Sequence, residues 1–124
     1  MIQPHSSSTL RGLYVDDADA RAALQEEAKK LPTLLLNSAA AANAVMLGGG
    51  YFNPLSGFMD KADALSVAQD LHTRSGLFWP IPILNLTSAE EHVQPGSRVA
   101  LLDPNVKGMP VLAIQDVESV ELLT

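Results

Sequence analysis

Residues 48–60, GGGYFNPLSGFMD, constrain the fold of this chain more than any other stretch. Three consecutive glycines, an Asn-Pro pair and a further glycine interrupt any helix or regular strand, so the segment must turn. Large apolar side chains nevertheless crowd into it: Tyr51, Phe52, Leu55, Phe58 and Met59. A turn so rich in aromatic side chains must lie in the core or against another surface. The pattern alone leaves these two alternatives open.

Two helices are predicted before this segment. Asp16 and Asp17 are N-cap candidates for the first helix, which Pro32 stops. Ser38 is the N-cap candidate for the second, which the alanines at 39–42 favour. Because glycine readily adopts a positive φ, we expect Gly48 to end this helix in the left-handed conformation.

A third helix is predicted directly after the segment. Asp60 followed three residues later by Asp63 is typical of a capped N-terminus. The apolar spacing predicts an inward face made of Ala64, Leu65, Ala68 and Leu71.

The remaining apolar runs predict strands. Residues 33–36 form a short buried strand, and residues 98–102 and 111–117 form an antiparallel hairpin around a turn at 103–108. Residues 77–86, LFWPIPILNL, contain two prolines, so they form either a strand with one unpaired edge or an extended connector. Helices followed by a hairpin indicate the α+β class.

The length of 124 residues fits one domain, which we expect to span residues 13–124 after a polar arm at 1–12. The net charge of −6 disfavours nucleic acid as a partner. No run is apolar enough to predict a membrane span, and there is no cysteine for a disulfide or thiolate site, so we expect a cytoplasmic chain.

No residue pattern indicates a catalytic or metal site. His5, His72 and His92 are scattered, and Ser56 lacks the glycine that precedes a nucleophile elbow. The glycines at 48–50 could cradle a phosphate, but no Gly-Lys-Ser/Thr follows and the run comes after a helix, so a structural turn is favoured.

The organising segment closely resembles one in the ATP sulfurylase (sulfate adenylyltransferase) family. The match to Gly-Gly-Tyr-Phe-Asn-Pro-Leu-Ser-Gly-Phe-Met is preceded by Asn-Ala-Val-Met at 43–46. The Trp-Pro-Ile-Pro run at 79–82, the Arg-Val-Ala-Leu-Leu-Asp-Pro run at 98–104 and the strand starting at Pro110 resemble later motifs of that family in the same order. The resemblance covers residues 13–120 and is greatest for enzymes of sulfur-oxidising bacteria.

The resemblance implies a PUA-like domain, a mixed β-barrel with about three flanking helices, placed before a catalytic domain. It also implies an enzyme that interconverts ATP and sulfate with adenosine 5'-phosphosulfate and pyrophosphate, using Mg²⁺. The family's catalytic motifs, Gln-x-Arg-Asn, His-x-x-His and Gly-Arg-Asp-His, do not occur in this sequence. We therefore expect this chain by itself to be inactive, with no catalytic, cofactor-binding or metal-binding residue.

The resemblance assigns the turn a role as a structural or interface signature. Its residues are Gly49, Gly50, Tyr51, Phe52, Asn53, Pro54, Leu55, Gly57, Phe58 and Met59. The expected partners are the C-terminal catalytic domain of the same enzyme and further copies in a homo-oligomer. Two other hypotheses remain: an RNA-binding PUA-type module, which the acidic charge argues against, and a stand-alone subunit-contact module.

Overall fold

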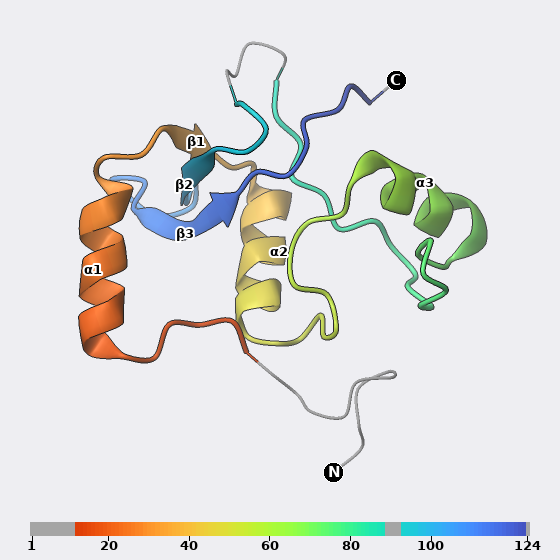
Figure 1. Ribbon diagram of the computed structural model, residues 1–124, viewed down its shortest axis with the longest axis horizontal. Coiled ribbons are helices and arrows are strands. Elements are labelled where there is room, and N and C mark those ends of the chain that lie inside the picture. The colour runs from red at the N-terminus through yellow and green to blue at the C-terminus, as the bar shows by residue number, and fades with distance from the viewer. Residues whose placement is uncertain (1–11, 89–92, 124) are drawn as a thin grey trace.

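The computed structural model describes residues 12–88 and 93–123, and its fold is α+β, as expected (Figure 1). The elements in chain order are α1 (Ala18–Ala28), β1 (Thr33–Leu35), α2 (Ser38–Gly48), α3 (Lys61–Asp70), β2 (Arg98–Leu102) and β3 (Val111–Asp116). The predicted arm lies outside the described residues except for Gly12.

Each helix begins at a side chain that accepts a hydrogen bond from a backbone amide of the first turn. Asp17 accepts from the amide of Ala20 at 2.8 Å, and Asp60 accepts from the amide of Asp63 at 2.8 Å, as predicted. The cap of α2 is Asn37, whose Oδ1 accepts from the amide of Ala40 at 2.7 Å. The prediction of a Ser38 cap was therefore wrong by one residue, because the side chain of the preceding residue, Asn37, caps the helix instead.

The buried face of α3 differs from the prediction. Ala64 and Val67 are buried, whereas Leu65, Ala68 and Leu71 are exposed. Residues three apart share one stripe of a helix, and the buried residues of α3 lie on the 64/67 stripe. Leu71 caps the helix in the left-handed conformation at φ 58°, which takes its side chain off the helical face.

The sheet has three strands in the order β1-β2-β3. β1 is parallel to β2, with Leu34 opposite Leu101, and β2 is antiparallel to β3, with Ala100 opposite Ile114. The expected hairpin is confirmed. Among the described residues the sheet is open, so the mixed β-barrel implied by the resemblance is corrected to an unclosed mixed sheet. In the described part of the chain, β3 pairs with β2 alone.

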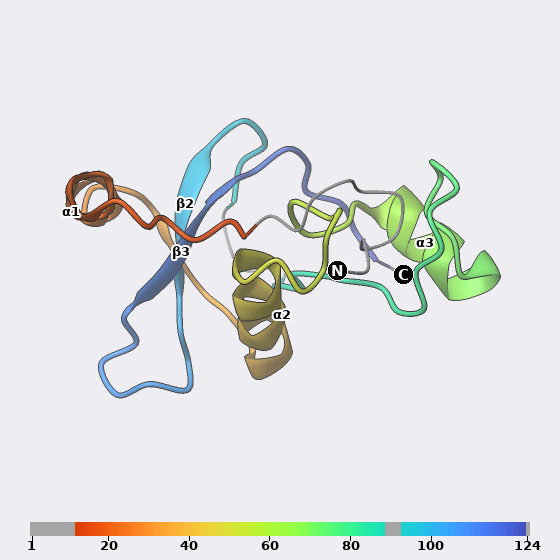
Figure 2. The same cartoon turned by 90° about the horizontal axis from the view of Figure 1, so that it is seen from below.

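Helices α1 and α2 lie on opposite faces of this sheet, as Figure 2 shows. The helix α2 buries Ala40 and Ala41 against the sheet, in one cluster with Leu34, Val99 and Leu101. Small side chains let the helix approach the strands closely. On the other face α1 buries only Ala28, so its packing is much lighter.

A second cluster lies between α3 and the connector that follows it. It contains Leu47, Val67, Trp79 and Ile83. Phe58 packs against both clusters and joins them. Residues 77–86 form the extended connector, since their one strand-like contact is the isolated bridge between His72 and Phe78. No helix among the described residues is long and apolar enough to cross a membrane.

Candidate functional site

The glycine run closes the C-terminal end of α2. The amide of Gly49 donates to the carbonyl of Val45 at 3.0 Å, and that of Gly50 donates to Leu47 at 3.2 Å. The amide of Tyr51 donates to the carbonyl of Met46 at 3.0 Å. These three amides already donate to helix carbonyls, so the amides do not form a phosphate cradle.

The left-handed residue of the run is Gly50, with φ 80°. Gly48 is still helical and the cap Gly49 has φ −77°, so the prediction that Gly48 adopts the left-handed conformation was wrong. The helix ends one residue later than expected and the left-handed residue lies two positions later, because residues 45–47 offer carbonyls to the amides that follow.

The rings of two tyrosines pack against Gly48 and Gly49, the other two glycines of the run. A Cβ on Gly48 would come within 2.5 Å of the Tyr14 ring, and one on Gly49 within 2.9 Å of the Tyr51 ring. Residues 13 and 14 are held here by their amides, which both donate to the carbonyl of Gly48, at 2.7 and 3.1 Å. The first two glycines thus provide space for rings, and sequence reasoning did not identify Tyr14 as the ring that needs it.

The turn itself is built on hydrogen bonds within the segment. The Asn53 side chain donates from Nδ2 to the carbonyl of Gly50 at 2.7 Å, and the Asn53–Pro54 peptide bond is cis. The amide of Leu55 donates to the carbonyl of Phe52 at 2.8 Å. Gly57 is exposed, and a Cβ there would meet no heavy atom within 4 Å.

The apolar side chains of the segment divide between core and surface. The Phe52 ring meets Trp79 edge to face, with centroids 5.6 Å apart and planes at 89°. Leu55, Phe58 and Met59 also pack against the second cluster, and the amide of Met59 donates to the carbonyl of Ile83 at 2.7 Å. Tyr51 alone among these residues points outward, with 74% of its surface exposed. The segment therefore joins α2 to the connector.

The described arginines are engaged in contacts within the protein. Arg98 donates from Nε to Asp116 at 2.8 Å and from its terminal nitrogen to Glu27 at 3.0 Å. The hydrogen bond to Asp116, followed by that to Glu27, raises the pKa of the Arg98 guanidinium. Arg74 pairs with Asp60 at 3.2 Å, and the Nε of Arg21 donates to the carbonyl of Val15 at 3.3 Å.

The polar residues do not assemble into a reactive set. Among residues 12–88 and 93–123, no group of three His, Asp or Glu side chains could hold a metal ion. The Nδ1 of His72 lies 2.7 Å from the carbonyl oxygen of Asp70, and Ser56 is exposed. The predicted position of His92 lies outside the described residues. With the glycine amides and arginines engaged as well, the described residues do not fit Mg²⁺ or a nucleotide phosphate.

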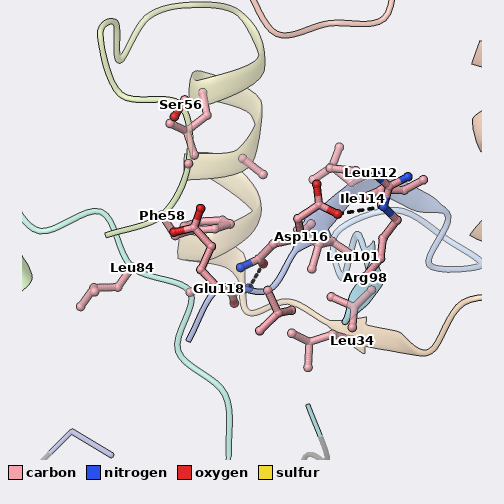
Figure 3. Close-up of a pocket in the computed structure, with 18 of the residues that line it drawn as sticks. Leu34, Ser56, Phe58, Leu84, Arg98, Leu101, Leu112, Ile114, Asp116 and Glu118 are labelled. Atoms are coloured by element: carbon pink, nitrogen blue, oxygen red, sulfur yellow. Dashed lines mark hydrogen bonds and ion pairs between the residues drawn. The ribbon is translucent and has the colours of Figure 1, made fainter. Parts of the chain in front are cut away.

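A large open cavity lies beside the sheet, with a volume of about 1810 Å³. Figure 3 shows Phe58 and Leu84 on one side of it, and Leu112, Ile114 and Asp116 of β3 on the other. Sequence reasoning missed this cavity. Its lining comes from segments far apart in the sequence, so no local pattern indicates it.

Known proteins are similar to this chain along nearly its whole length. The family described as "PUA-like domain" matches residues 2–122. The sulfate adenylyltransferase of Alcanivorax borkumensis is 52% identical over 124 residues, all of this chain and 31% of the relative. That of Allochromatium vinosum is 49% identical over 121 residues, 98% of this chain and 30% of the relative.

Among solved structures, "Hexameric APS kinase from Thiobacillus denitrificans" matches with a TM-score of 0.75 and 36% identity. The match covers 94% of this chain and 23% of that chain. The chain thus spans less than a third of the length of these relatives.

Proposed function

Since this chain belongs to the family of PUA-like domains, we propose that it is the N-terminal structural domain of a sulfate adenylyltransferase. The observation that carries the proposal is 52% identity to such an enzyme along all 124 residues. The signature segment, residues 48–60, supports it, because Gly50, Phe52 and Phe58 are used in holding the fold.

In this proposal the chemistry belongs to the rest of the longer polypeptide. That enzyme interconverts ATP and sulfate with adenosine 5'-phosphosulfate and pyrophosphate, and its other parts bind ATP and Mg²⁺. Such a reaction requires cations that stabilise phosphate charge. Here the described arginines are paired with carboxylates or a carbonyl, and the glycine amides bond to helix carbonyls.

The direct test compares this chain with a chimera. The chimera joins residues 1–123 to the remainder of the Alcanivorax borkumensis relative at the aligned position. Pyrophosphate release from ATP and sulfate is measured for both proteins. We expect turnover by the chimera and none by the 124-residue chain. Turnover by the short chain would refute the assignment of the chemistry to the rest of the longer polypeptide.

The proposed partners are the catalytic domain in the same polypeptide and further copies of that polypeptide in a cytoplasmic homo-oligomer. The matched Thiobacillus denitrificans protein is described as hexameric, which supports assembly. The net charge of −6 disfavours RNA. Titration with single-stranded RNA at low salt checks this, and micromolar binding that weakens with salt would favour the RNA-binding hypothesis instead.

A further inference from the structure

The C-terminal segment, residues 117–123, runs from the end of the sheet to the start of α3. At its beginning Val117 is buried, and its amide donates to the carbonyl of Ser97 at 2.8 Å. Further along, Glu121 and Leu122 bond to Lys61, the first residue of α3. Figure 1 shows the chain leaving β3 and passing towards α3. The segment is therefore held at two points, once at the sheet and once at α3.

Lys61 holds the segment with two different groups. Its Nζ donates to the carbonyl of Leu122 at 2.9 Å, and its backbone amide donates to the Oε1 of Glu121 at 3.3 Å. That amide lies in the first turn of α3, where amides have no partner within the helix and the helix dipole favours a carboxylate. The Oγ of Ser119 donates to the same carboxylate oxygen at 3.2 Å, which restrains Glu121 in this position.

The charges at the start of α3 allow a third carboxylate to approach. Asp60 and Asp63 alone would repel Glu121, because like charges at short range raise the energy. Arg74 pairs with both aspartates, with Asp60 at 3.2 Å and with Asp63 at 3.5 Å. The ammonium group of Lys61 supplies a second positive charge. Three carboxylates thus face two cations, and Glu121 is tolerated beside the helix.

Apolar packing does not explain the position of the segment. Val120, Leu122 and Leu123 are all exposed, and Leu122 has 73% of its surface exposed. Among residues 117–123, only Val117 is buried. The polar contacts with Lys61 therefore position the part of the segment beyond Val117.

We propose that Lys61 and Glu121 form a clamp that fixes the direction in which the longer polypeptide leaves this domain. This inference rests on the proposed function, which places the chain before the catalytic domain of such a polypeptide. A flexible linker lets neighbouring domains move relative to each other, whereas a fixed one restricts their geometry. The clamp holds the following part in one orientation relative to α3. Lys61 is a positioning residue and takes no part in the chemistry.

Backbone dynamics test the clamp in the 124-residue chain. We expect amide order parameters for residues 120–122 of about 0.85 in the unmodified chain and below about 0.6 in Lys61→Met, which keeps the apolar stem but lacks the donor. The amide of Val117 is the internal control and stays rigid in both proteins. Lys61→Arg retains a donor for the carbonyl of Leu122 and should restore rigidity. Rigid residues 120–122 in Lys61→Met, or mobile ones in the unmodified chain, would overturn the proposal.

A matched variant and a second measurement separate positioning from general stability. Lys30→Met removes an exposed ammonium group just after α1 and should leave residues 120–122 rigid. Lys61→Met should leave Tm nearly unchanged, because the contacts that it removes lie at the surface. Loss of order throughout α3 together with residues 120–122 would indicate unfolding of the helix and contradict a positioning role.

The chimera tests the consequence for the longer polypeptide. This chain has no cysteine, so Val106→Cys in the exposed hairpin turn provides a single site for a spin label. A second label is attached to one cysteine in the remainder, whose other cysteines are replaced. We expect double electron–electron resonance to give a narrow distance distribution in the chimera and a wider one when Lys61→Met is added. Equal widths would overturn the proposal.

The outcomes separate this inference from the proposed function. A chimera that turns over ATP and sulfate but has equal distance distributions with and without Lys61→Met contradicts the clamp alone. A chimera in which Lys61→Met widens the distribution but which has no turnover contradicts the enzymatic assignment alone.

Discussion

At the scale of single residues, the three glycines of the signature segment have different reasons to be glycine. Gly50 has φ 80°, where a side chain is strained, whereas Gly48 is helical and lies under the Tyr14 ring. Tyr14 is 59% exposed, so its ring can move aside. The cost of a methyl group should therefore differ between the two positions.

We expect Gly50→Ala to lower the free energy of unfolding by about 1–2 kcal/mol, the cost of a left-handed residue that has a Cβ. Gly48→Ala should change it by less than about 1 kcal/mol, because the better helix propensity of alanine offsets the lost contact with Tyr14. Urea denaturation of both variants checks the contrast. Equal losses of unfolding free energy in the two variants would contradict the different roles of Gly48 and Gly50.

A second prediction at this scale concerns the aromatic side chains. Phe58→Ala should lower the free energy of unfolding by about 2–3 kcal/mol, somewhat less than for a fully buried ring, because Phe58 is half-buried between two clusters. Tyr51→Ala is the control and should cost less than about 1 kcal/mol, since the ring is 74% exposed. A loss below 1 kcal/mol for Phe58→Ala would mean that the ring contributes little to the core.

At the scale of elements, α1 is the least anchored helix. It buries one alanine, and Arg98 links it to the sheet by bridging Glu27 and Asp116. The raised pKa of Arg98 means that its favourable interaction is complete below the unfolded-state pKa of arginine and is lost only as pH rises through the folded value. The bridge is therefore insensitive to arginine titration near neutral pH.

We expect Arg98→Gln to accelerate amide exchange throughout α1 while leaving α2 unchanged. Raising the ionic strength of the unmodified chain should have a smaller effect in the same direction, because the bridge is solvent-exposed and screened by salt. Residue-resolved hydrogen exchange measures both. Acceleration of α2 to the same extent would indicate global destabilisation.

Sequence reasoning succeeded at this scale where the determinants are local. The caps Asp17 and Asp60 and the turn of the β2–β3 hairpin are set by residues a few positions away. Sequence reasoning failed where contacts between residues far apart in the sequence determine the local structure. The inward stripe of α3 through Val67 depends on the position of Trp79, and the left-handed glycine depends on how far α2 continues.

At the scale of the whole molecule, Phe58 links the cluster beneath the sheet to the cluster around Trp79. We expect thermal unfolding followed by far-ultraviolet circular dichroism and by Trp79 fluorescence to give coincident transitions. In Phe58→Ala the two transitions should separate, with the Trp79 transition at the lower temperature. Coincident transitions in the variant would show that contacts other than those of Phe58 are enough to link the two clusters.

The open sheet is the feature that sequence reasoning could not reach at this scale. The three strands and the β2–β3 hairpin were predicted, but the parallel pairing of β1 with β2 and the open sheet of the described residues follow from tertiary packing. For the candidate site, the turn was predicted from its glycines and Asn53–Pro54. The division of its aromatic side chains, Tyr51 outward and Phe52 against Trp79, was not.

The parallel pairing of β1 with β2 has a consequence for synthesis on the ribosome. Thr33 pairs with Ala100, so β1 leaves the ribosome 67 residues before its partner. At about 5–20 residues per second, the nascent β1 waits roughly 3–13 seconds for β2. Of the secondary-structure elements that share a cluster with Leu34 and Leu36, α2 has already left the ribosome during that interval, whereas β2 has not. We therefore expect the alanine-rich helix to be the first element to pack on β1, before the rest of the sheet forms.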